Sequence, residues 1–136
     1  MNKLKQKGQF LELPIIGLKI SNIIYNGMVT LVFDDLEESY LDIHSVFIVS
    51  QYNQQKELSQ RKKESLVFFH EQYGQVIKEA KASKEGVLFV EFENGTSFIV
   101  EDGPYENWHY TKKSTTNKMD ALYVHGGVGS TIYNAK

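Results

Sequence analysis

Two Asn-Gly pairs constrain the fold of this chain more than any other feature of its sequence. Asn26-Gly27 separates two apolar runs, residues 17–25 and 28–33, and Asn94-Gly95 separates residues 87–92 from 97–100. Asn-Gly between apolar runs is the strongest short signal for a β-hairpin, because both residues tolerate the positive φ that such a turn requires. Eight Tyr and eight Phe among 136 residues, with only two Pro, also favour strands. The sequence therefore predicts a mainly β protein.

One segment has the periodicity of a helix instead. Leu58, Leu66, Phe69 and Tyr73 recur near one stripe of a 3.6-residue helix, and Gly74 follows them. Glycine is favoured just after a helix, where a left-handed conformation costs it little. This spacing predicts one helix over about residues 57–73.

The segments on either side of this helix are alike. Residues 17–52 and 74–110 each read as glycine, strand, glycine turn, strand ending in Phe, acidic turn and strand. We expect an internal repeat of two antiparallel β-meander units joined by the central helix. The length suits a single domain, 1–136. The predicted class is α+β, mainly β, with the two units forming a single sheet or a partly open barrel.

Composition excludes several classes of protein. The chain has no cysteine, which excludes disulfides, Cys-ligated zinc and thiol nucleophiles. A formal net charge of -2 gives no support for a nucleic-acid partner. No apolar run approaches a membrane span, and the N-terminal lysines precede no apolar segment of the kind found in secretion signals. We expect a cytoplasmic protein that binds neither nucleic acid nor membrane.

Acidic residues concentrate in two segments that lack Lys and Arg, residues 34–42 and 91–106. A face of this charge attracts a basic protein and speeds association. The alternative interpretation is that both segments are ordinary solvated turns. The candidate partner-binding residues are Asp34, Asp35, Glu37, Glu38, Glu93, Glu101 and Asp102.

Catalytic and cofactor motifs are absent from the sequence. It has no phosphate-binding glycine loop, no nucleophile elbow and no His-Glu-x-x-His, and its four histidines lack i, i+2 or i, i+4 metal-ligand spacing. We therefore expect no enzyme activity, no cofactor and no metal.

The most distinctive string is Tyr-Glu-Asn-Trp at residues 105–108, followed by His109. A Trp on a strand is usually a core residue. The alternative is that Tyr105, Glu106, Trp108 and His109 line the pocket of a small-ligand-binding, barrel-like protein or of a minor enzyme.

Residues 17–20, 86–100, 105–108 and the pair Gly126-Gly127 together resemble a family of small bacterial β-rich proteins of unassigned function. The resemblance spans most of residues 13–132, and the polar insert at 111–118 departs from it. Such proteins resemble the immunity partners encoded beside polymorphic toxins. The resemblance implies a cytoplasmic, non-catalytic protein that binds and blocks a cognate toxin. A further hypothesis is a homodimer paired through exposed edge strands.

Overall fold

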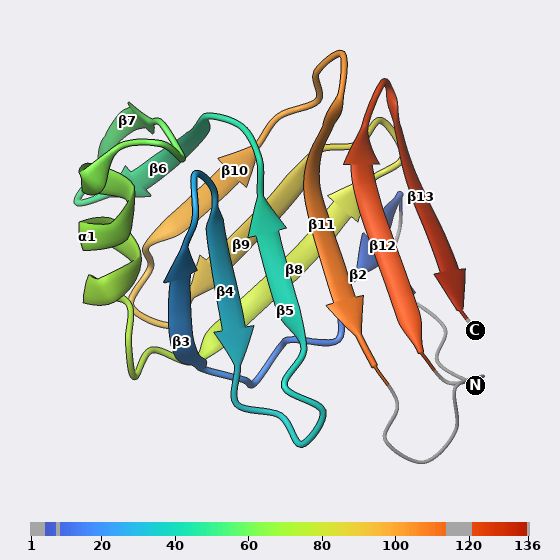
Figure 1. Cartoon of the computed structure of the whole chain (residues 1–136), viewed down its shortest axis with the longest axis horizontal. Helices are drawn as coiled ribbons and strands as arrows, with labels where there is room; N and C mark the ends of the chain where they lie inside the picture. The colour runs from blue at the N-terminus through green and yellow to red at the C-terminus, as the bar shows by residue number, and fades with distance from the viewer. Residues whose placement is uncertain (1–4, 8, 114–120, 136) are drawn as a thin grey trace.

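The computed structural model describes residues 5–7, 9–113 and 121–135, which form two facing antiparallel sheets with one helix at the side (Figure 1). The seven-stranded sheet contains, in spatial order, β1 (Lys5–Lys7), β2 (Phe10–Glu12), β8 (Ile77–Ser83), β9 (Leu88–Phe92), β10 (Ser97–Val100), β6 (Phe47–Gln51) and β7 (Gln54–Leu58). The six-stranded sheet contains β13 (Ser130–Ala135), β12 (Leu122–Gly127), β11 (Glu106–Lys112), β5 (Tyr40–Ile43), β4 (Val29–Phe33) and β3 (Ile20–Tyr25).

The mainly β class is confirmed, but the expectation of a single sheet or a partly open barrel is wrong. The last predicted strand of the first repeat unit, which follows the acidic turn and ends by residue 52, divides into β5 and β6, which belong to different sheets. The chain leaves β5 after Ile43 and enters β6 at Phe47. Between β10 and β11 it crosses back. The meanders β3-β4-β5 and β8-β9-β10 therefore lie in opposite sheets.

Each meander is extended by strands from the other half of the chain. β5 pairs with β11, and β10 pairs with β6. Both predicted hairpins are present, since β3 pairs with β4 across Gly27 and β9 pairs with β10 across Gly95. Positive φ falls on the glycine alone in each turn, so neither Asn adopts the positive φ that was expected of both residues of the Asn-Gly pair.

Alternation along the strands builds the core between the sheets. In β4, Val29, Leu31 and Phe33 are buried while the residues between them are half-buried, and β9 repeats this pattern. Successive side chains of a strand point to opposite faces, so one face of each sheet is apolar. The two apolar faces cover each other, which is the main source of stability in such a sandwich.

The helix α1 spans Lys63–Glu71 and is shorter than the predicted 57–73. The first two residues of the predicted helix, 57 and 58, belong to β7, which forms a hairpin with β6 through Tyr52 and Asn53, both at positive φ. Phe68 and Phe69 of α1 pack against Phe47 and Phe98, with ring centroids 5.0 to 6.5 Å apart across this cluster. The helix α1, which carries two of these rings, lies at one end of the sandwich (Figure 1).

Trp108 joins the sheets away from the helix. Its indole is fully buried, and Nε1 donates a hydrogen bond of 2.9 Å to the carbonyl oxygen of Gly86, in the β8–β9 turn of the other sheet. The indole also lies against Gly126 of β12, where an added Cβ would come within 2.3 Å of Nε1. At Gly127, φ is +137° and a Cβ would lie 2.0 Å from the carbonyl oxygen of Tyr105. The Gly-Gly pair is therefore required by the close approach of Trp108 and β11.

We expect Gly126→Ala to destabilise the protein by about 3 kcal/mol, because the new methyl group would overlap a buried indole that has no free space to enter. Gly95→Ala is the control: its φ is +89° but a Cβ there would meet nothing within 4 Å, so only backbone strain of about 1 kcal/mol applies. Urea denaturation followed by fluorescence of the single Trp measures both. Equal losses would contradict this role for Trp108.

Candidate functional site

The first acidic segment forms the turn between β4 and β5, residues 34–39, which we call the acidic turn. Its two aspartates are engaged within the fold: Asp34 Oδ1 accepts a hydrogen bond from the Lys19 amide at 2.9 Å, and Asp35 Oδ1 accepts one from the Ser39 amide at 2.8 Å. Between them and Glu38, Leu36 is 97% exposed. The turn therefore holds an apolar side chain in solvent among carboxylates, a feature that the sequence analysis did not single out.

A buried phenol lies near this turn. Tyr110 of β11 is fully buried, and among the described residues its hydroxyl has no hydrogen-bond partner. Burial, reinforced by the carboxylates of Asp35 and Glu37, raises the pKa of Tyr110 well above its ordinary value of 10.0. The phenol consequently stays neutral under ordinary conditions and adds no charge beneath the turn.

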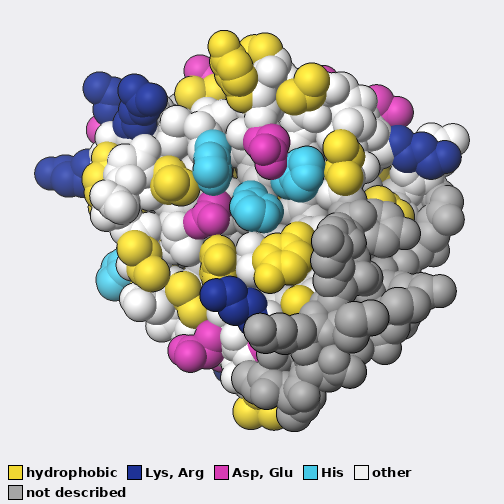
Figure 2. Space-filling model, turned by 45° about the vertical axis from the view of Figure 1, so that its right-hand side comes forward, with side chains coloured by type: hydrophobic (Ala, Val, Ile, Leu, Met, Phe, Trp, Pro, Cys, Tyr) yellow, Lys and Arg dark blue, Asp and Glu magenta, His cyan; other side chains and the backbone are white. Residues whose placement is uncertain are grey.

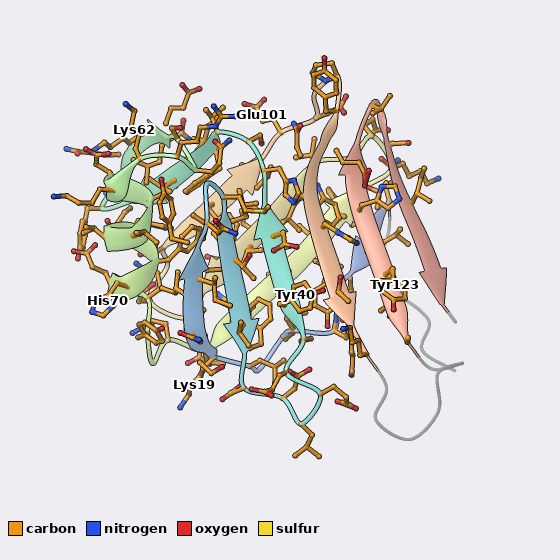
Figure 3. All side chains as sticks on the ribbon, in the orientation of Figure 1. Lys19, Tyr40, Lys62, His70, Glu101 and Tyr123 are labelled. Atoms are coloured by element: carbon orange, nitrogen blue, oxygen red, sulfur yellow. The ribbon has the colours of Figure 1, made fainter. Side chains whose placement is uncertain are left out.

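The predicted acidic residues do not form one face. Glu93 lies in the β9–β10 turn, while Glu101 and Asp102 precede β11. Figure 3 shows Glu101 at the opposite end of the sandwich from Lys19, whose amide binds Asp34. Asp102 Oδ1 accepts a hydrogen bond of 2.7 Å from the Gly129 amide, which links the β12–β13 turn to the segment before β11. The acidic turn combines carboxylates with an aliphatic side chain that is almost fully exposed.

The pocket predicted near Trp108 does not form around that residue. Trp108 is 0% exposed and fills the space between the sheets, whereas Tyr105 is 77% exposed at the outside of the molecule. Glu106 and His109 also lie outside the core, on the outer face of the six-stranded sheet. The sequence placed these four residues in one site, but the structure places Trp108 in the core and the other three outside it.

Histidines and carboxylates gather on this outer face (Figure 2). Adjacent strands place Thr30, Asp42, His109 and His125 opposite one another in a row. Thr30 donates a hydrogen bond to Asp42, the rings of His109 and His125 are 6.2 Å apart, and Glu106 Oε1 lies 3.2 Å from His125 Nδ1. Burial lowers the pKa of His109; Asp42 and Glu106 oppose this shift, while His125 and His44 add to it. The row is a titratable surface on an open sheet.

Within the described part of the chain, no three His, Asp or Glu side chains are arranged to hold a metal ion. No helix of the described residues is long and apolar enough to cross a membrane.

A groove of about 590 Å³ opens where α1 meets β3, the edge strand of the six-stranded sheet. We call it the helix-edge groove. At the β3 edge, the Ile23 amide donates a hydrogen bond of 2.9 Å to Asn22 Oδ1, so that edge amide already has a partner within its own strand. The groove is lined by Ile23, Tyr25, Leu66, Val67, His70, Glu71 and Tyr73.

Comparison with models of protein families identifies the family of this chain. The model of a family of unknown function, DUF6188, matches residues 11–119. The chain belongs to this family. No curated protein and no solved structure matches the chain. The part of this DUF6188 protein that the family model covers includes the acidic turn, α1 and His109, and it ends before β12, which carries His125.

We expect the free energy of unfolding of this DUF6188 protein to fall as pH drops from about 7.5 to 5, partly because of His109. Its pKa is lower in the folded chain than the ordinary 6.5, so the unfolded chain binds a proton more readily. The stability that neutral His109 provides is present above pH 6.5 and is lost as pH falls through the lower, folded pKa.

Urea denaturation at several pH values measures this dependence. His109→Gln should make the decline shallower, and His70→Gln, on the exposed side of α1, is the control. The same slope in wild type and His109→Gln would contradict the assignment.

Proposed function

We propose that this protein is a non-catalytic protein-binding module that recognises a basic partner through the acidic turn. The observation that carries the proposal is Leu36, an apolar side chain 97% exposed at the tip of a turn whose other side chains are mostly acidic. Such a side chain contributes nothing to the core, and its burial in a partner would be favourable.

The turn is prepared for binding by its own hydrogen bonds. Asp34 and Asp35 fix its two ends to the Lys19 and Ser39 amides, which leaves Glu37 and Glu38 beside Leu36. A loop that is already ordered loses less conformational entropy when it binds. The chemistry of a fitting partner follows: an apolar pocket whose rim carries Lys or Arg.

A more specific proposal is that the partner is a cognate bacterial toxin, which this protein neutralises in the cytoplasm. A toxin that acts on nucleic acid needs a cationic site, and a rigid acidic turn is complementary to such a site. The resemblance of residues 86–100 and 105–108 to small bacterial proteins of unassigned function, which themselves resemble immunity partners of toxins, supports the same proposal.

The two halves of the chain would have arisen by duplication. Support comes from matching irregularities: Ile20 pairs with Phe33 and Ile77 with Phe92, and a bulge follows each of these pairs. Gly17 and Gly74, three residues before Ile20 and Ile77, have φ of +87° and +84°. The β9–β10 turn then corresponds to the acidic turn, with Asn94-Gly95 as its hairpin residues. It has no counterpart of the exposed leucine, so under this proposal binding is a specialisation of the first half.

We expect the triple variant Leu36→Ser, Glu37→Lys, Glu38→Lys to bind its partner about 100-fold more weakly, equal to about 2.7 kcal/mol, because it removes the apolar contact and reverses the adjacent charge. The test is co-expression with the C-terminal domain of a toxin-like protein encoded next to this gene. Growth rescue and affinity are measured together.

The control is Glu57→Lys, an exposed charge reversal on β7. It should preserve neutralisation. If the wild-type protein neutralises the toxin and the triple variant does so equally well, the acidic turn is not the contact surface. If the wild-type protein does not bind the toxin, the toxin-neutralising role is wrong.

A further inference from the structure

We infer that the helix-edge groove binds a lysine or arginine side chain presented by an extended segment of a partner protein. This site is separate from the acidic turn, and its test does not depend on the toxin proposal. The argument rests on what α1 leaves uncovered, on the aromatic rings in the groove and on its charge.

The helix leaves an apolar surface open. It buries Ser65, Phe68 and Phe69, whereas Val67 on its outer side remains 51% exposed. Tyr25 and Tyr73, which lie in the same groove, are 42% and 37% exposed. The volume of about 590 Å³ is within the range of ordinary ligand sites and exceeds the needs of one side chain, so neighbouring residues of a bound segment also fit.

Both walls of the groove supply aromatic rings. On the β3 side, the Tyr25 hydroxyl donates a hydrogen bond to the Arg61 carbonyl oxygen, which restricts the position of its ring. On the helix side, the His70 and Tyr73 rings pack edge to face with centroids 5.3 Å apart. Figure 3 shows His70 at the lower end of α1. The face of a tyrosine ring attracts an ammonium or guanidinium group.

The charge of the groove selects a cation. Its lining contains the carboxylate of Glu71 and no Lys or Arg. Among the described residues, this carboxylate has no hydrogen-bond or ion-pair partner. Glu71 is also the last residue of α1, and the C-terminal end of a helix carries partial negative charge. Glu71 and the helix dipole therefore act in the same direction.

The residues that complete the groove suit the stem of such a side chain. Ile23, Leu66 and Val67 provide apolar contacts for the methylene groups of Lys or Arg, while the charged end reaches Glu71 and the tyrosine rings. A neutral apolar side chain would use the same contacts but would leave the carboxylate without a partner.

The test is titration of the ¹⁵N-labelled full-length protein with Nα-acetyl-lysine methylamide and its arginine analogue, monitored through backbone amide signals. Nα-acetyl-norleucine methylamide, which has a similar apolar stem and no charge, is the matched ligand control. We expect millimolar binding of the cationic compounds, with shifts concentrated at Ile23, Tyr25, Val67 and Tyr73, and at least tenfold weaker binding of the norleucine compound.

Two variants separate the groove from the rest of the surface. Glu71→Gln should weaken binding of the cationic compounds at least fivefold. Glu64→Gln, which removes a carboxylate from a neighbouring cleft on the same helix, should leave it unchanged. The amide spectra report whether each variant is folded. Equal binding of the norleucine compound, equal effects of the two variants, or no shifts in the groove at tens of millimolar ligand would overturn the inference.

Discussion

The contact of the Trp108 indole with glycine backbone fixes how the two sheets meet. Trp108 lies opposite Ile43 in the six-stranded sheet and donates its hydrogen bond to Gly86 in the other sheet. The phenylalanine cluster around α1 closes another part of the same interface. Because a buried carbonyl without a partner costs about 1–3 kcal/mol, the hydrogen bond to Gly86 also favours one relative placement of the sheets. The turns at the sheet ends depend on this placement.

Both proposed binding surfaces follow from that frame. The acidic turn connects β4 and β5, each of which has a neighbouring strand on both sides, so the sheet holds both ends of the turn while Leu36 remains exposed. The helix-edge groove exists because α1 directs Phe68 and Phe69 into the core and fills only part of the space beside β3. In both places, buried residues hold a small exposed surface in position. A surface held in this way needs little reordering when it binds a partner.

Local patterns in the sequence were sufficient to predict the hairpins, the alternation of buried residues and the mainly β class. They were insufficient wherever the outcome depends on distant residues. No pattern in residues 44–46 indicates that the chain passes from one sheet to the other at this point. Residues 54–58 have one apolar side chain, so their pairing with β6 has no strand-like pattern. The acids were predicted from composition, but the partners that distinguish Asp34 and Asp102 from freely exposed carboxylates are 15 and 27 residues away. The groove joins β3 to α1, about 40 residues apart, and no local signal marks it.

Although the net charge of the chain is only -2, its acidic and basic residues concentrate in separate segments. This separation affects which ligands each proposed surface can select. The acidic turn presents Glu37 and Glu38 without nearby Lys or Arg in its own sequence, whereas α1 begins at Lys63, directly after Lys62, and ends with Glu71. Figure 3 shows Lys62 and His70 at opposite ends of this helix. The groove therefore favours one cation at the C-terminal end of α1 and repels further cations toward its N-terminal end. Under the two proposals, a strongly basic partner matches the acidic turn, and a segment with a single Lys or Arg matches the groove. The proposed surfaces thus differ in the density of positive charge that each would accept, although both proposals call for a positive ligand.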